Sequence, residues 1–247
     1  MREKLLIGVR HAQTNANKRN LESGNRLFGG QSETGLSPDG LLQASVLYAK
    51  FYQFMGSLDA VYSSPLGRAT QTAEMLGLQS SMVIDPRLTE RGLGKLTGVC
   101  SDQVPRRFSD LPELVKAHSI DPELLAIRAT FRSNLSRLVG AESYHDVVGR
   151  VRPLVRRIEE SDDIRSCLLL THKHLMRCLM YVLEGEDPSA QEEICQRSVR
   201  NCSPIAYVYN GERWDHVEDA WGVIKERLDS TEFNSLQQSK VLEKVCS

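Results

Sequence analysis

The sequence predicts an α/β fold: a three-layer α/β/α sandwich with a mostly parallel central sheet and a helical cap insertion. Short apolar runs alternate with segments of helical periodicity, which is typical of parallel sheets with helices on both faces. The run Leu5 to Val9 is too short for a helix and suits a strand buried on both faces. Two strand-like segments flank the turn Asn210-Gly211 and predict a hairpin over 205–217.

The other elements follow from local signals. Residues 15–35 are rich in Asn, Gly, Ser and Arg, and they are predicted as a loop. Ser37 is a suitable N-cap, and Pro38 a suitable first residue, for a helix that runs to about residue 55. Further strands are expected at 58–62, 82–84 and 167–170, and further helices at 69–76, 144–160 and after residue 172 to about 183.

One segment interrupts this alternation. Residues from about 95 to 142 mix Pro, Asp and Arg with short helical patterns, and we interpret them as an insertion into one large domain that spans residues 1–218. Residues 219–247 are polar with scattered apolar positions. They are predicted to form a C-terminal extension that is helical or mobile.

The composition limits the expected partners. Lys plus Arg number 31 and Asp plus Glu 32, so the net charge of −1 argues against nucleic-acid and anionic-membrane binding. No apolar run reaches the ~18 residues of a membrane span. The six cysteines lack C-x-x-C spacing, so we expect no zinc cluster, and a cytoplasmic setting with free thiols is the simplest interpretation.

Chemically active side chains follow four of the predicted strands, at the sheet edge where ligands bind in open α/β folds. In chain order they are Arg10 and His11, then Arg68, then Glu90, then His172. Arginine binds phosphate oxygens through two parallel hydrogen bonds, and a neutral imidazole can attack phosphorus and carry the phosphoryl group. A second imidazole can hydrogen-bond the transferring oxygens, and a carboxylic acid can protonate the leaving oxygen and then activate water. Since the guanidinium groups supply the positive charge, the pattern predicts phosphoryl transfer without a metal or a cofactor.

Five segments carry longer patterns in a fixed order. Residues 10–17 read RHAQTNAN, 36–44 read LSPDGLLQA, and 63–73 read SSPLGRATQTA. Residues 88–98 read LTERGLGKLTG, and 169–177 read LLTHKHLMR. Together these segments resemble the histidine phosphatase superfamily in its phosphoglycerate mutase-like branch, whose first motif is R-H-G-[EQ]-T-x-x-N.

The resemblance implies a role for each matching residue. His11 is the implied nucleophile that becomes phosphohistidine, and Glu90 is the implied proton donor. The residues implied to line the phosphate pocket are Arg10, Asn17, Arg68 and His172. The insertion at about 95–142 is implied to lie over the pocket and to select the leaving group.

Two positions depart from the family pattern. Ala12 stands where the family has glycine, and we expect one methyl group to be tolerated there. Lys173 replaces the glycine after the second histidine, where it either adds to the positive field or crowds the pocket. His172 and His174 form an H-x-H pair, but no third ligand is evident in the sequence, so we expect no metal site.

The leading hypothesis is a metal-independent phosphomonoesterase that acts on a small phosphorylated metabolite. Phosphoglycerate mutase-type transfer is an alternative, because Glu90-Arg91 resembles the mutase E-R dipeptide. Leu93 at the mutase tyrosine position, and an insertion without the mutase arginine pair, favour hydrolysis. An inactive module that binds a phosphorylated ligand is a second alternative. The expected partner is the small substrate and neither nucleic acid nor membrane, while a homodimer stays open.

Overall fold

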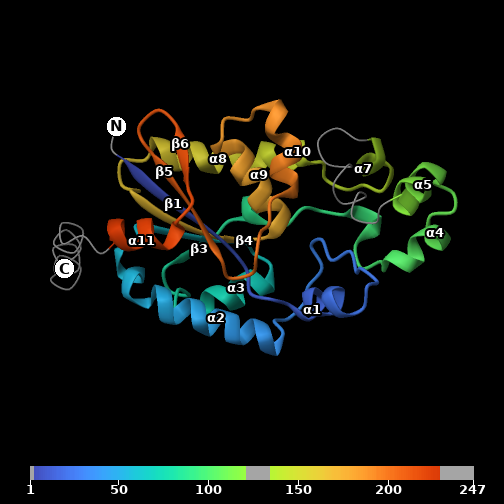
Figure 1. Cartoon of the computed structure of the whole chain (residues 1–247), viewed down its shortest axis with the longest axis horizontal. Coiled ribbons are helices and arrows are strands. Elements are labelled where there is room, and N and C mark those ends of the chain that lie inside the picture. The colour runs from blue at the N-terminus through green and yellow to red at the C-terminus, as the bar shows by residue number, and fades with distance from the viewer. Residues whose placement is uncertain (1–2, 121–133, 229–247) are drawn as a thin grey trace.

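A six-stranded sheet forms the centre of the protein in the computed structural model, which describes residues 3–120 and 134–228 (Figure 1). In sheet order the strands are β3 (Met82–Ile84), β2 (Ala60–Ser63), β4 (Ser166–Thr171), β1 (Lys4–Arg10), β5 (Pro204–Tyr209) and β6 (Trp214–Val217). The first four are parallel, and β5 and β6 form the predicted hairpin, in which β5 is antiparallel to both of its neighbours, β1 and β6. The α/β class and the mostly parallel sheet are confirmed.

Helices cover both faces of the sheet (Figure 1). One face carries α8 (Tyr144–Glu160), α9 (Lys173–Leu183) and α10 (Gln191–Gln196), and the other carries α2 (Pro38–Phe51), α3 (Gly67–Met75) and α11 (Ala220–Leu228). Successive side chains of a strand point to opposite faces. In β1, Leu6 therefore packs with the first group of helices, whereas Leu5, Ile7 and Val9 pack with the second.

Helix α1 (Asn15–Glu22) corrects the loop predicted for residues 15–35. Thr14 is its N-cap: the Thr14 hydroxyl accepts a hydrogen bond from the Asn17 backbone N–H at 3.1 Å, and Asn17 Oδ1 accepts one from the Thr14 N–H at 3.2 Å. The helix buries none of its residues, so it shows no hydrophobic period. The reciprocal cap is the feature that specifies it.

Helix α2 begins where the sequence predicts. Ser37 Oγ accepts a hydrogen bond from the Gly40 N–H at 3.0 Å, and Pro38 is the first helical residue. The helix ends at Phe51 and continues as a 3-10 helix over Tyr52–Ser57. A Cβ at Gly40 would lie 2.0 Å from the Gln13 carbonyl oxygen, so only glycine allows the helix this close to the segment that follows β1.

The insertion forms short helices at one end of the molecule, beyond the sheet (Figure 1). They are α4 (Val104–Arg107), α5 (Pro112–Ile120) and α7 (Asn134–Leu138), and residues 121–133 lie outside the described residues. This end has its own apolar core, made of Phe28, Leu93, Leu96, Val99, Val104, Phe108, Leu114 and Val139. A separate core is consistent with a segment that is inserted into the sheet domain rather than threaded through it.

Helix α11 lies within the predicted C-terminal extension. Its residues Ala220, Ile224 and Leu228 are buried in the same core as α2 and α3. Residues 229–247, the rest of that extension, lie outside the described residues.

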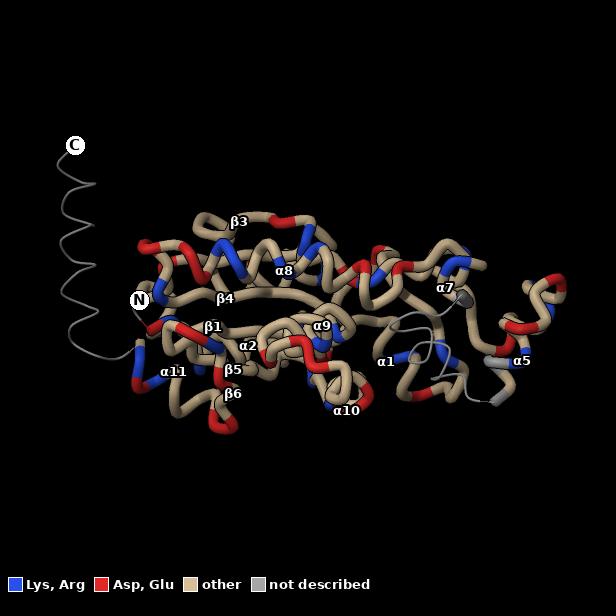
Figure 2. The backbone as a smooth tube through the Cα atoms, turned by 90° about the horizontal axis from the view of Figure 1, so that it is seen from above, with Lys and Arg blue, Asp and Glu red and all other residues tan. Residues whose placement is uncertain are grey.

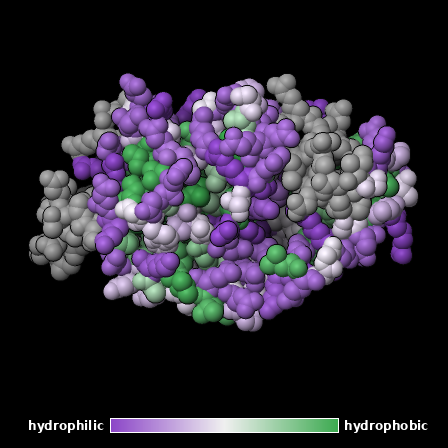
Figure 3. Space-filling view, in the orientation of Figure 1, coloured by the Kyte–Doolittle hydropathy of each residue, from purple (hydrophilic) through white to green (hydrophobic). Residues whose placement is uncertain are grey.

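The surface is mixed in charge and mostly hydrophilic. Figure 2 shows Lys and Arg interspersed with Asp and Glu along the chain, and Figure 3 shows scattered hydrophobic groups on one face. Each helix of the described ranges is too short or too polar to cross a lipid bilayer.

Candidate active site

The carboxyl ends of three adjacent strands form the base of the candidate site. β1 pairs with β4 up to Arg10 and Thr171, and β2 pairs with β4 up to Ser63 and Leu170. These are central strands, so the residues that follow them emerge side by side at one edge of the sheet. His11, His172 and Ser64 are those residues, and all three are buried.

His11 is held in one tautomer. Its Nδ1 lies 2.7 Å from the backbone carbonyl oxygen of Ala12, which can only accept a hydrogen bond, so Nδ1 carries the proton. Burial, followed by the charges of Arg10 and Arg68, holds the pKa of His11 well below its usual range. The ring is therefore neutral at pH 7, with an unshared electron pair on Nε2. This is the form of histidine that can act as a nucleophile.

Ala12, where the family motif has glycine, fits its position. The residue is fully buried, and its backbone N–H donates to Thr72 Oγ1 of α3 at 3.0 Å. The Asn201 side chain donates to the His11 carbonyl oxygen at 2.7 Å. These two contacts fix the backbone on both sides of the His11 ring.

Arg10, which is partly buried, and Arg68, which is buried, place two guanidinium groups at the same pocket. Arg10 donates from one terminal nitrogen to the Val199 carbonyl oxygen at 2.8 Å, and its Nε is enclosed without a hydrogen-bond partner in the described part of the chain. Burial lowers the pKa of Arg10 to about 10, which leaves it cationic at pH 7. A buried cation with an unused donor is unfavourable by itself and is stabilised when an anion binds.

Three hydrogen bonds orient Arg68. Its terminal nitrogens donate to the carbonyl oxygens of Ser32 at 2.8 Å and Gly30 at 2.9 Å, and its Nε donates to His172 Nδ1 at 3.2 Å. A guanidinium group has five N–H donors. Two donors therefore remain for a ligand in the pocket.

His172 lies beside the pocket and supports Arg68. Because its Nδ1 accepts from Arg68, its Nε2 carries the proton and donates to Ser64 Oγ at 2.7 Å. The ring is fully buried, and its centroid lies 5.1 Å from that of His11. In this structure both ring nitrogens are engaged by the protein.

Asn17 lines the pocket from the first turn of α1. Its Oδ1 is occupied by the Thr14 backbone N–H, so its side-chain NH2 group is the end that a ligand oxygen can use. Lys173, the first residue of α9, also lines the pocket, as do Arg26 and Arg91. The pocket is thus cationic at several points, with Glu90 as its carboxylate.

Glu90 lies in a loop that follows β3, here called the acid loop (residues 87–92). The Glu90 side chain is 8% exposed; its Oε1 accepts from the Arg91 backbone N–H at 2.8 Å, and its Oε2 accepts from the His174 backbone N–H at 3.4 Å. It contributes to the same pocket as His11. The structure thus brings together Arg10, His11, Asn17, Arg68 and Glu90, with His172 directly behind.

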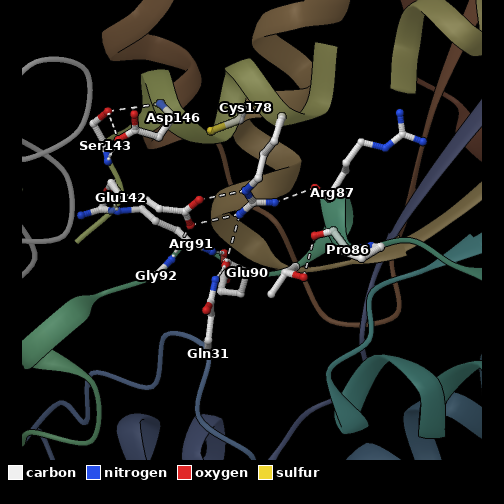
Figure 4. Close-up of polar contacts among 12 residues, drawn as sticks. Gln31, Pro86, Arg87, Glu90, Arg91, Gly92, Glu142, Ser143, Asp146 and Cys178 are labelled. Carbon is white, nitrogen blue, oxygen red and sulfur yellow. Dashed lines mark hydrogen bonds and ion pairs between the residues drawn. The ribbon is translucent and has the colours of Figure 1, made fainter. Parts of the chain in front are cut away.

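An ion pair that the sequence did not reveal holds the acid loop (Figure 4). Arg150 of α8 pairs with Glu142 at 2.9 Å, and it donates to the carbonyl oxygens of Arg87 at 2.5 Å and Glu90 at 3.3 Å. Glu142 Oε2 accepts from the Gly92 N–H at 2.7 Å. The pair therefore contacts both ends and the middle of the loop that carries the carboxylate. The available signal was the position of Glu142 just before the Ser143 cap, with Arg150 two helical turns later.

Three histidines at or beside the pocket make the stability of the protein depend on pH. Burial is the largest cause of the lowered pKa of His11, His172 and His174, so the folded chain resists protons that the unfolded chain takes up near pH 6.5. The contribution of these neutral histidines to the free energy of unfolding is complete above pH 6.5 and is lost as the pH falls below that value. We expect the free energy of unfolding to fall by about 1.4 kcal/mol per pH unit for each excess proton. Denaturant titrations between pH 7.5 and 5 measure this slope.

One variant assigns part of this slope to His11. His11→Asn should make the dependence of the free energy of unfolding on pH shallower by about one proton. Equal slopes for the wild type and His11→Asn would contradict the assignment.

Comparisons with known proteins agree with this geometry. A model of the histidine phosphatase superfamily (branch 1) matches residues 6–221. A 2,3-bisphosphoglycerate-dependent phosphoglycerate mutase of Bartonella henselae is 26% identical over 219 residues, which are 85% of this chain and 94% of the mutase. A mutase of the same name from Azorhizobium caulinodans is 28% identical over 83% of this chain and 92% of its own length.

A solved structure is similar over nearly the same span. A mycobacterial glucosyl-3-phosphoglycerate phosphatase complexed with VO3 is 28% identical, with a TM-score of 0.64 and coverage of 87% of this chain and 97% of the phosphatase. The family match includes every segment that supplies the pocket. The protein therefore belongs to the histidine phosphatase superfamily.

Proposed function

We propose that the protein is a metal-independent phosphomonoesterase that acts on a small phosphorylated metabolite through a phosphohistidine on His11. The observation that carries the proposal is the state of His11, whose neutral ring has its unprotonated Nε2 in a pocket that the guanidinium groups of Arg10 and Arg68 also line. A nucleophile and an anion-binding site in one pocket are what phosphoryl transfer needs.

The first step transfers the phosphoryl group to the protein. His11 Nε2 attacks phosphorus while the remaining N–H donors of Arg10 and Arg68 and the Asn17 amide bind the phosphoryl oxygens. The bond from phosphorus to the ester oxygen breaks, and Glu90 in its acid form protonates that oxygen. His172 maintains the orientation of Arg68 during this step.

The second step releases phosphate. Glu90, now a carboxylate, takes a proton from water as the water oxygen attacks the phosphorus of phosphohistidine. The N–P bond breaks and its electron pair returns to His11 Nε2. The same two arginines bind the phosphoryl oxygens in both steps, so neither step requires a new source of charge.

Mutase-type transfer is the second candidate, and the names of the sequence relatives favour it. Leu93 favours hydrolysis, because an apolar side chain lines the pocket where the mutase pattern has tyrosine. The similarity to a solved phosphatase over 87% of the chain adds support. An inactive phospho-ligand-binding module is the third candidate.

A substrate panel separates the three candidates. Release of phosphate from 4-nitrophenyl phosphate, sugar phosphates and phosphoglycerates, in the presence of a chelator, is expected for the phosphatase. A mutase would interconvert 2- and 3-phosphoglycerate when 2,3-bisphosphoglycerate is supplied, with little net phosphate. Phosphate binding without either reaction would identify the inactive module. Four expectations stay predictions: a small-molecule partner, no nucleic-acid or membrane partner, a cytoplasmic setting, and a homodimer as one possible oligomeric state.

The ion pair behind the acid loop is expected to matter for activity. Arg150→Met removes the donors to Arg87 and Glu90 and leaves Glu142 without its cation. A small displacement of a catalytic group costs about 10- to 100-fold in rate, so kcat/KM for an aryl phosphate should fall by that factor. The matched control is Arg152→Met, which breaks the Arg152–Glu186 pair on the same helix. Equal activity of both variants, each assayed well below its Tm, would contradict a role for Arg150.

A further inference from the structure

Gln43 belongs to a sequence motif to which the proposed mechanism gives no role. It lies in LSPDGLLQA, residues 36–44, on the second turn of α2, and it is half-buried. Its side-chain oxygen, Oε1, accepts a hydrogen bond from the backbone N–H of Gln13 at 3.0 Å. Gln13 comes two positions after His11, so this contact reaches the segment that carries the proposed nucleophile.

The peptide group between Ala12 and Gln13 is held at both ends. Its carbonyl oxygen, which belongs to Ala12, lies 2.7 Å from His11 Nδ1, and its N–H, which belongs to Gln13, donates to Gln43. A trans peptide group is planar, so its carbonyl and its N–H point in opposite directions and turn together. The hydrogen bond to Gln43 therefore fixes the direction of the carbonyl oxygen that accepts the His11 proton.

The preceding peptide group, between His11 and Ala12, is also held at both ends. Its carbonyl oxygen accepts from the Asn201 side chain at 2.7 Å, and its N–H donates to Thr72 Oγ1 at 3.0 Å. With this group fixed, the Ala12 carbonyl oxygen can leave His11 only if the Ala12–Gln13 group rotates. Thr72 also donates to the Arg68 carbonyl oxygen, at 2.7 Å, so a change of Thr72 would alter two parts of the site. Gln43 is therefore the residue that tests this rotation separately.

We infer that Gln43 is a positioning residue, which keeps the His11 proton on Nδ1 by holding the Ala12 carbonyl oxygen toward that nitrogen. With the proton on Nδ1, the electron pair of Nε2 can form the bond to phosphorus. With the proton on Nε2, that nitrogen has no electron pair for the attack. The inference rests on the proposed function for its effect on the rate, whereas the position of the proton can be measured without a substrate.

Gln43→Leu removes the acceptor oxygen and keeps a good helix-forming residue in α2. The Ala12 carbonyl oxygen is then able to turn away from His11, so the tautomer with its proton on Nε2 becomes populated. We expect kcat for 4-nitrophenyl phosphate to fall by about tenfold, the usual size of one hydrogen bond. KM should change by less than about twofold, because Gln43 does not line the pocket in the described part of the chain.

Nitrogen NMR of protein with isotope-labelled histidine reports the tautomer directly. In the wild type, His11 should show a protonated Nδ1 and an unprotonated Nε2. In Gln43→Leu the two nitrogen signals of His11 should move toward each other, because both tautomers are then populated. A role of Gln43 in folding alone would lower the Tm and leave these signals where they are.

Two further variants of α2 serve as controls. Gln43→Glu keeps an oxygen acceptor, so it should restore the wild-type His11 signals and bring kcat to within about threefold of the wild type. Ser45→Ala removes an exposed hydroxyl group that donates to the Leu41 carbonyl oxygen at 3.0 Å, and it should change neither measurement. The Ser37 N–H donates to the Gln13 carbonyl oxygen at 2.9 Å, so α2 keeps a contact with the nucleophile segment in all three variants.

The outcomes separate this inference from the proposed function. Shifted His11 signals and a lower kcat in Gln43→Leu, both reversed in Gln43→Glu, support the inference. Wild-type signals in Gln43→Leu overturn it, and so do shifted signals with an unchanged kcat, while the phosphatase stands in either case. If the wild type hydrolyses no phosphate ester, the proposed function fails, and the NMR result alone then supports or overturns the control of the tautomer by Gln43.

Discussion

Substitution of His11 by alanine is expected to lower kcat for 4-nitrophenyl phosphate by about a thousandfold or more. The variant lacks the nitrogen that accepts the phosphoryl group, and the second imidazole cannot replace it because both nitrogens of His172 are engaged. Release of 4-nitrophenolate gives the rate directly. Unchanged turnover would refute the proposed nucleophile.

Two further measurements distinguish a missing nucleophile from a damaged pocket. His11→Ala should still bind inorganic phosphate, because Arg10, Arg68 and Asn17 do not depend on the His11 side chain for their hydrogen bonds. The wild type, quenched in alkali during turnover, should carry a phosphoryl group that intact-protein mass spectrometry detects. The variant should carry none.

Arg68→Lys is expected to lower kcat/KM by about 100-fold, although it preserves the charge. A lysine amine has three donors on a single nitrogen. It cannot contact the carbonyl oxygens of Ser32 and Gly30 and His172 Nδ1, and also present two parallel N–H groups to a phosphate. The loss should appear in both kcat and KM, because the phosphoryl oxygens contact this group in the ground state and in the transition state.

Arg177→Lys is the matched control for Arg68→Lys. Arg177 is equally buried, but it donates to the Arg197 carbonyl oxygen and does not line the pocket. Its substitution should change the Tm and leave kcat/KM within about twofold. Similar losses of kcat/KM in the two variants would show that any buried arginine is required for folding, and would contradict a specific role for Arg68.

The sheet, and the edge of the sheet that carries the candidate site, were predictable from the sequence for a physical reason. The central strands are buried on both faces, so they appear as short continuous apolar runs that end abruptly. The residue that ends such a run in β1 or β4 lies at the sheet edge, and this places Arg10, His11 and His172 near one another without any knowledge of the connecting segments.

Other parts could not be predicted because their signals are not periodic. Helix α1 buries none of its residues, so the polar composition of 15–35 indicated a loop although the Thr14–Asn17 cap was present. The positions of Glu142 and Arg150 hinted at an ion pair, but no local pattern encodes the contacts of that pair with the acid loop. The engagement of both His172 nitrogens likewise depends on Ser64 and Arg68, which lie more than 100 positions away in the chain.

The base of the insertion has a consequence for how this protein can change over evolutionary time. Gly92 and Glu142 exchange two hydrogen bonds, and the Lys95 N–H donates to the Val139 carbonyl oxygen at 2.8 Å, so the two ends of the insertion are joined where they leave the sheet domain. Doubling the length of a chain segment between fixed ends costs only about 0.6 kcal/mol. Longer or shorter segments can therefore replace this one while Glu90 keeps its place, so the insertion can change in length without rebuilding the site.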